Sequence, residues 1–164
     1  MTGTFPTTFR GVFLAVAITL GGMSAPVLAE DSAVEVPSDD AAMSAAIAKA
    51  RAELPQFWEA LAKPAADTEG YALKVAIHDG ANVEHFWTSD IEQKDGKITA
   101  VIANEPQLVT TVKEGQRVDV PESDISDWMF FREGKIVGNE TMRALLIRLP
   151  AEEAEQYRAM LENP

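Results

Sequence analysis

Apolar side chains recur every three or four positions in residues 41–61, and this spacing predicts a helix. The segment is rich in alanine, which has the highest helix propensity. The resulting stripe consists of Met43, Ile47, Ala50, Leu54, Trp58 and Leu61. Pro55 interrupts it, because proline lacks an N–H and its ring clashes with the carbonyl four residues earlier. We expect a kink there, or one helix that ends near Glu53 and a shorter one that starts at Pro55. Phe57 and Trp58 should pack on a sheet.

From residue 71 onward the period of the pattern changes to two, which is typical of β-strands. Turn sequences separate the alternating runs, and Asp95-Gly96 is the clearest of them. The predicted strands are residues 71–77, 83–91, 98–102, 116–120 and 127–132. The third should pair antiparallel with the second. Glu133-Gly134 then turns the chain towards residues 135–137.

The last part of the chain favours helix. In residues 141–149 the apolar side chains would share one helical face: Met142, Leu145, Leu146 and Leu149. Pro150 suits the first position of a final helix, with Glu152 and Glu153 near its positive end. The sequence thus predicts an α+β fold. Its curled antiparallel sheet of about five strands has N-terminal helices packed on one face and a C-terminal helix.

Residues 1–29 have the order of a secretory signal peptide. Arg10 is their only charged residue, residues 11–22 form an apolar core, and residues 27–29 offer a cleavage signal of small residues. The apolar run is shorter than the ~20 residues that span a bilayer. We therefore expect cleavage after Ala29 and no stable membrane insertion afterwards.

Residues 30–40 are acidic and lack periodicity, and are expected to form a flexible lead-in to a single domain, residues 41–164. The chain has no cysteine, so an exported protein of this sequence has no disulfides. These features predict a periplasmic or secreted location.

The net charge of the chain limits the classes of partner that it can bind. Removing the signal segment leaves 13 basic and 26 acidic residues, a formal net charge of −13. Such a surface repels nucleic acid and anionic lipid headgroups. Solubility is the simpler interpretation of this charge, and attraction to a basic partner or to divalent cations is the alternative.

The chain resembles the bacterial domain family DUF2314, also called YegJ-like, over roughly residues 41–161. The matching pieces are Glu84-His85-Phe86-Trp87, Ser89-Asp90-Ile91, Asn104-Glu105-Pro106, Lys113-Glu114-Gly115-Gln116, Ile125-Ser126-Asp127-Trp128-Met129, Gly134-Lys135, Val137-Gly138-Asn139, Thr141 and Arg143. Residues 48–55, followed by Phe57-Trp58, resemble the helical lead of the family. The resemblance implies a small α+β domain, found both by itself and attached to other modules. It implies no activity, cofactor or catalytic residue.

Aromatic and charged residues give the first candidate site. If their strands lie close, Trp87 and Trp128 could line one apolar pocket, although large aromatic residues more often belong to the core. Asp127 is disfavoured inside a strand and needs a partner. Arg143 or Arg117 could supply one, since a guanidinium group matches a carboxylate.

Catalytic and metal-binding sets are weakly supported. His85 and Ser89 share a strand face, but four strand positions span roughly 13 Å, too far for the hydrogen bond of a catalytic pair. Two histidines and no cysteine fall short of a structural zinc site. The acidic run from Asp119 to Asp127 lacks the spacing of a calcium loop. Asn104 and Gln116 are expected to hold irregular backbone through their amides.

The sequence therefore favours an exported, non-enzymatic module that binds a small molecule or a protein, with no catalytic residue, metal or cofactor assigned. The candidate binding residues are His85, Trp87, Asn104, Asp127, Trp128 and Arg143. The alternative is a small periplasmic hydrolase-type enzyme that uses Asp127 or His85 as its acid–base group. A third interpretation makes all of these residues determinants of the core.

Overall fold

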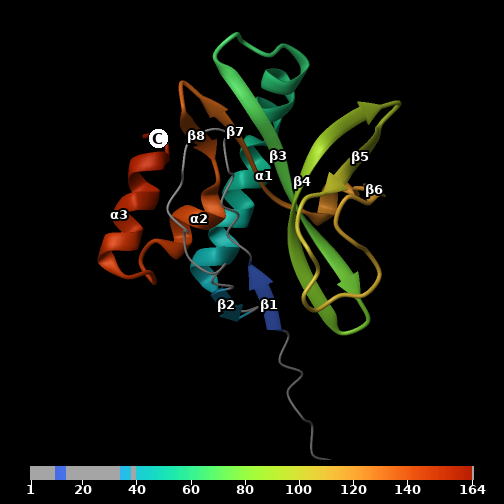
Figure 1. The fold of residues 1–164 in the computed structure, drawn as a ribbon, viewed down its shortest axis with the longest axis horizontal. Coiled ribbons are helices and arrows are strands. Elements are labelled where there is room, and N and C mark those ends of the chain that lie inside the picture. The colour runs from blue at the N-terminus through green and yellow to red at the C-terminus, as the bar shows by residue number, and fades with distance from the viewer. Residues whose placement is uncertain (1–9, 14–33, 38–39, 164) are drawn as a thin grey trace, which may run out of the picture.

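Residues 10–13, 34–37 and 40–163 are described in the computed structural model (Figure 1). The predicted signal peptide and acidic lead-in lie largely outside the described residues and stay predictions. In chain order the elements are β1 (Arg10–Phe13), β2 (Val34–Pro37), α1 (Ala41–Ala62), β3 (Thr68–Asp79), β4 (Asn82–Lys94), β5 (Lys97–Ile102), β6 (Arg117–Asp119), the 3-10 helix η1 (Glu122–Asp124), β7 (Ile125–Arg132), β8 (Lys135–Gly138), α2 (Glu140–Leu145) and α3 (Ala151–Met160).

An antiparallel sheet of six strands, β3 to β8, is the centre of the described chain. Its order is β4-β3-β7-β8, with β5 beside β4 and β6 beside β5. β1 pairs parallel with β4 at Val83–His85, and β2 pairs antiparallel with β1. The predicted α+β class and the antiparallel pairing of β4 with β5 are confirmed. The part of the sheet from β3 to β8 has one strand more than the five predicted, because the run after Glu133-Gly134 pairs with β7 as β8. With β1 and β2 the sheet has eight strands.

The long strand β4 takes part in two regions of the sheet. Thr88 pairs with β3 on one edge and with β5 on the other. Beyond it, the register between β4 and β5 shifts between Ser89 and Glu92, and Asp90 has a positive φ of 48°. Such a bulge bends a strand. The far half of β4 therefore projects with β5 and β6 as an arm away from the helices (Figure 1).

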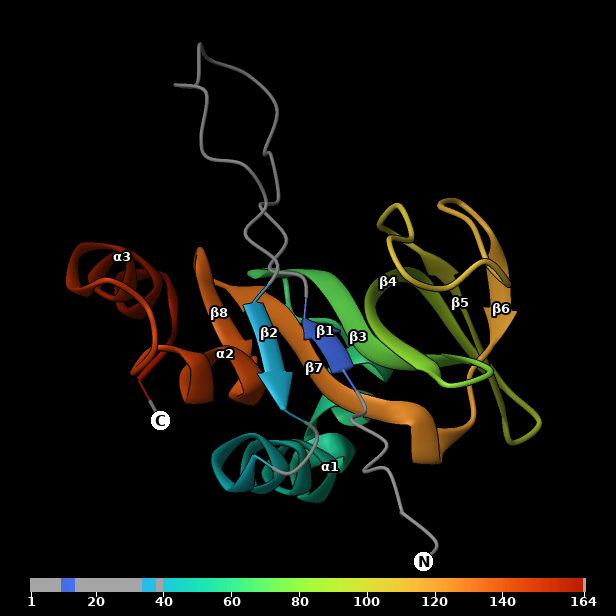
Figure 2. The same cartoon turned by 90° about the horizontal axis from the view of Figure 1, so that it is seen from below.

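α1 covers one face of the sheet (Figure 2). Asp40 caps it, because its Oδ1 accepts the N–H of Met43 at 2.7 Å. The helix continues through Pro55, so the expectation of a second helix starting there is wrong. Leu54 and Phe57 are buried on either side of the proline, and their packing on the sheet compensates for the lost hydrogen bond. The predicted packing of Phe57 is confirmed.

α2 and α3 lie beside β8 (Figure 2). α2 confirms the helix favoured within residues 141–149, although it is shorter, and Pro150 stands at the N-cap of α3. On the side of the sheet opposite α1, residues of β3, β4, β7 and β8 and the residue after α3 form another apolar cluster: Ala72, Trp87, Met129, Ile136 and Leu161. Among the described helices, none is both long enough and apolar enough to cross a membrane.

The turn from β8 into α2 requires glycine. Gly138 has a φ of +80°, and an added Cβ would lie 2.5 Å from the backbone oxygen of Trp128. Left-handed backbone costs about 1–2 kcal/mol for other residues, and overpacking adds about 1–3 kcal/mol. We expect Gly138→Ala to lower the free energy of unfolding in urea by about 2–5 kcal/mol.

Gly134→Ala is the matched control. Gly134 has a φ of +75° with nothing within 4 Å of an added Cβ. Only the backbone cost of about 1–2 kcal/mol should remain there. Equal losses in the two variants would contradict the close approach of Gly138 to Trp128.

Candidate functional site

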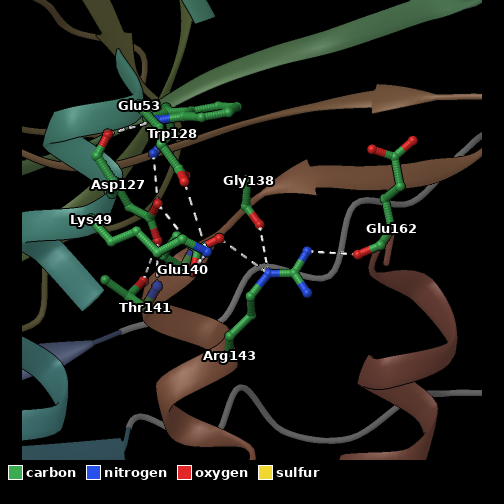
Figure 3. Close-up of polar contacts among 10 residues, drawn as sticks. Lys49, Glu53, Asp127, Trp128, Gly138, Glu140, Thr141, Arg143 and Glu162 are labelled. Atoms are coloured by element: carbon green, nitrogen blue, oxygen red, sulfur yellow. Dashed lines mark hydrogen bonds and ion pairs between the residues drawn. The ribbon is translucent and has the colours of Figure 1, made fainter. Parts of the chain in front are cut away.

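A buried carboxylate connects β7 to the start of α2. Asp127 is 0% exposed, and its Oδ2 accepts the N–H and the hydroxyl of Thr141 at 2.7 and 2.6 Å. Its Oδ1 accepts the N–H of Trp128 at 2.9 Å and that of Glu140 at 3.2 Å (Figure 3). The first N–H groups of a helix lack partners within the helix. Asp127, and not Asn139 at the N-cap position, supplies the capping oxygens for α2.

A buried lysine completes this cluster. Lys74 on β3 lies opposite Asp127 on β7 in the strand register, and it is 3% exposed. Its Nζ donates to the hydroxyl of Thr141 at 3.0 Å, and that hydroxyl donates to Asp127. The ammonium also lies 4.9 Å from the centre of the Trp87 ring, a cation–π distance. The chain Lys74–Thr141–Asp127 thus joins β3, α2 and β7.

Burial acts on both charges of this chain. It lowers the pKa of Lys74 to about 8, while the nearby Asp127 acts in the opposite direction. Burial likewise raises the pKa of the Asp127 carboxyl, against the attraction of Lys74 and the hydrogen bonds from Thr141 and Trp128. Each charge is therefore favoured chiefly by the presence of the other.

His85 lies next to this cluster, on β4. Its Nδ1 is 2.8 Å from the hydroxyl of Ser126, which donates to the backbone oxygen of Lys74 at 3.1 Å. A hydroxyl has one proton, so we assign the hydrogen of the imidazole to Nδ1, which donates to Ser126. Burial, followed by the charges of Lys74, His78 and Arg51, lowers the pKa of His85 to about 3. The ring is therefore neutral at pH 7.

The two tryptophans lie on opposite faces of the sheet, so a shared pocket is wrong. In the strand register, Trp87 lies opposite Lys74 of β3, and Trp128 lies opposite Leu73, the preceding residue of the same strand. Successive strand residues face opposite sides. Trp128 is packed under α1, where its indole N–H donates to the oxygen of Ala50 at 2.8 Å. The core interpretation of Trp128 is confirmed.

The predicted arginine partners of Asp127 are also wrong. The Nε of Arg143 donates to the oxygen of Gly138 and lies 3.3 Å from the carboxylate of Glu140 (Figure 3). Glu140 also pairs with Lys49 of α1 at 2.9 Å. Arg117 is on the arm, where it pairs with acidic residues of β4. The N–H groups of α2 and the hydroxyl of Thr141 occupy the carboxylate of Asp127 instead.

A second buried carboxylate organises the connection between β5 and β6. Glu84 accepts the N–H groups of Gln107, Leu108 and Val109 at 2.8–3.2 Å. Asp79 accepts the N–H and hydroxyl of Thr110, and these hydrogen bonds lower the pKa of Asp79. Residues 103–116 are called the β5–β6 loop below.

Two amides hold the ends of the β5–β6 loop. Asn104 Oδ1 accepts the N–H of Trp87 at 3.2 Å, and Gln116 Oε1 accepts the N–H of Lys113 at 3.1 Å. The predicted role of both amides in holding irregular backbone is confirmed. Of the six candidates, His85, Trp87 and Asp127 lie around Lys74, whereas Asn104, Trp128 and Arg143 lie elsewhere.

Sequence reasoning missed Lys74, Glu84, Ser126 and Thr141. One signal was present for Glu84, because it alternates with Phe86 and Thr88 on what proves to be a buried face. A carboxylate there needs strong donors. In the described part of the chain, no three histidine or acidic side chains are grouped so that they could hold a metal ion.

Comparison with known proteins places the chain in a family. Residues 40–162 match the model of an uncharacterized protein conserved in bacteria, DUF2314. The chain belongs to the DUF2314 family. It is 43% identical over 131 residues to the uncharacterized protein YegJ of Escherichia coli (strain K12), which covers 80% of this chain and 84% of that protein.

A second relative is named after a different kind of module. A putative ankyrin repeat protein of Neisseria meningitidis serogroup B is 40% identical over 81 residues. The match covers 49% of this chain and 32% of the relative. No solved structure matches the chain.

The burial of Lys74 and Asp127 next to each other predicts that substitutions of the two residues have strongly coupled effects on stability. Lys74→Met or Asp127→Asn leaves the other charge without its partner, and each should lower the free energy of unfolding by about 3–5 kcal/mol. The double variant removes both charges, so we expect a coupling energy of about 1–3 kcal/mol in urea unfolding. Arg117→Met, at an exposed pair, is the control and should cost less than about 1 kcal/mol. Additive losses for Lys74 and Asp127 would contradict the coupling.

The lowered pKa of His85 predicts that the folded protein loses stability in acid. Its pKa of about 3 in the folded state lies below the usual histidine pKa of 6.5, so the unfolded chain binds the proton first as the pH falls. The contribution is complete above pH 6.5 and decreases between there and about pH 3, by up to about 1.4 kcal/mol per pH unit. From pH 7 to 5, the protein should lose on the order of 2 kcal/mol more than His85→Asn. Parallel pH profiles of unfolding would show that His85 is not responsible.

Proposed function

We propose that this protein is a non-enzymatic interaction module that acts in the periplasm and binds a protein through its β5–β6 loop. The observation that carries the proposal is the way in which the loop is held. Residues 103–116, all of them described, contain neither helix nor strand. Ordered loops of this length inside compact domains are uncommon and usually functional.

The loop is pre-organised by a buried carboxylate. The Glu84 carboxylate is buried, and an ionised carboxylate is costly to remove from water unless it is fully hydrogen-bonded. Here it serves to fix three consecutive backbone N–H groups of the loop. A loop that is already ordered loses less entropy when it binds a partner.

The loop also presents an apolar contact. Leu108 is 37% exposed, whereas the neighbouring Val109 is buried against Phe86 and Ile102. The core of a protein interface is more apolar than the rest of the surface, so we take Leu108 as the contact point of the loop. Support for a protein partner comes also from the relative named a putative ankyrin repeat protein, because such repeats form extended binding surfaces.

The periplasmic location rests on the signal-peptide features of residues 1–29. The candidates His85, Trp87 and Asp127 then belong to the scaffold behind the loop. The alternative, a hydrolase with Asp127 or His85 as acid–base group, is less well supported. Asp127 is completely buried, and the pKa of about 3 for His85 lies far from the neutral range that suits a general base.

Site-specific crosslinking tests the proposal. A photoreactive amino acid replaces Leu108 in the full-length chain expressed in bacteria, and the periplasmic fraction is examined after irradiation. We expect a discrete crosslinked product, with the protein beginning at Glu30 by intact mass. Glu84→Gln in the same chain should abolish the product, because the amide cannot accept all three loop N–H groups.

The control places the same photoreactive group at Ile147, which is 78% exposed on the connection between α2 and α3. No product should form there. Products at Ile147 identical to those at Leu108, or products unaffected by Glu84→Gln, would refute a partner site at the loop. Absence of the protein from the periplasm would refute the location.

A further inference from the structure

The two residues that follow α3 dock on the open edge of β8. Leu161 forms a parallel bridge with Ile136, and the N–H of Glu162 donates to the oxygen of Ile136 at 2.8 Å. We call Leu161–Glu162 the docked segment. Its backbone extends the sheet beyond β8, as an added strand would.

The side chains of the docked segment are held separately. Leu161 is 5% exposed and belongs to the apolar cluster of Trp87, Met129 and Ile136. The carboxylate of Glu162 accepts two hydrogen bonds from Arg132, from Nε at 3.0 Å and from Nη2 at 2.6 Å. This is the fork geometry in which a guanidinium group recognises a carboxylate.

Arg143, on α2, also binds the docked segment. Its Nη2 donates to the backbone oxygen of Glu162 at 2.8 Å, while its Nε is engaged by Gly138 and Glu140 (Figure 3). Arg132 therefore binds the side chain of Glu162, and Arg143 binds its backbone oxygen. The β8 edge, Arg132, Arg143 and the apolar cluster together are called the tail groove.

The helix before the docked segment is attached by contacts of its own. Ala154 is buried, Tyr157 packs against the cluster of Met43, Met142 and Leu145, and Lys135 donates to the backbone oxygen of Ala159. The helix lies at the periphery beside β8 (Figure 1). Because these contacts do not involve Leu161 or Glu162, the docked segment can leave the β8 edge while α3 stays in place, and a competitor that supplies the same contacts can take its position.

We propose that the tail groove is a peptide-binding site, which the chain fills with its own docked segment and which takes an extended partner peptide with an apolar residue followed by an acidic one. Main-chain pairing to an edge strand with pockets for particular side chains is an established mode of peptide recognition. The preference for an acid follows from Arg132, and the apolar preference from the cluster around Leu161.

A partner peptide fits the groove better than the tail of a second copy. The chain has a formal net charge of −12, so two copies repel each other, whereas a short peptide carries few charges. The docked segment competes at the effective concentration of a tethered ligand, which is of millimolar order for short flexible links. Binding in trans is therefore weak until the docked segment is released. This site is distinct from the β5–β6 loop and does not depend on it.

Peptide titration of the full-length protein tests the inference. The probe is a fluorescein-labelled peptide of residues 156–163, read by fluorescence anisotropy. Leu161→Asp should release the docked segment, because it places a charge in the apolar cluster. We expect this variant to bind the peptide at least tenfold more tightly than the unchanged protein does. A peptide that carries Leu161→Asp itself should not bind.

Exchange of charges supplies the specific control. Arg132→Glu should reject the natural peptide and bind a peptide in which the glutamate is replaced by arginine. This pair tests the inference also if Leu161→Asp does not fold, as judged by circular dichroism. No binding by a folded released variant, or binding indifferent to Arg132, would overturn the inference. A dimer of the unchanged protein that Leu161→Asp dissociates would overturn it in favour of exchange between copies.

Discussion

The buried chain from Lys74 through Thr141 to Asp127 is the interaction on which the rest of the described structure depends. An unpaired charge in the interior is costly, so these three groups fix the relative positions of β3, β7 and the start of α2. Because Asp127 caps α2, that helix is held against the β7–β8 hairpin. Arg143 in turn reaches Glu162 from α2, so the attachment of the end of the described chain follows from the same buried pair.

The two faces of the sheet differ in chemical character. The face under α1 is closed by apolar packing around Phe57 and Trp128. The opposite face combines the polar cluster with Trp87, whose ring lies against both Lys74 and the cluster that receives Leu161. Polar residues that specify a unique arrangement and apolar residues that receive a chain segment thus lie side by side there. This proximity links the scaffold to the tail groove.

Among the described residues, buried carboxylates hold backbone without regular hydrogen bonds in two places. Asp127 satisfies the free N–H groups at the start of α2, and Glu84 satisfies those of the β5–β6 loop. In both places a carboxyl side chain replaces the hydrogen bonds that regular structure would have provided. The β5–β6 loop and the start of α2 are thereby held without disulfides, in agreement with the lack of cysteine in the sequence.

The sequence by itself determined the kinds of element and their order. The period of apolar residues depends on local geometry, so it identified α1, β3 to β7 and the last two helices, whereas β1, β2 and β8 were not expected. Amides such as Asn104 revealed their local role. Only the tertiary structure decided the partners of Asp127, the separation of Trp87 from Trp128 and the continuity of α1 through Pro55. Alternation along a strand divides residues between two faces, but strand register decides which residues meet, and it is set by contacts distant in sequence. The irregular pairing that brings Ser126 to His85, and the return of the chain after β8 that brings Thr141 to Asp127, are of this kind.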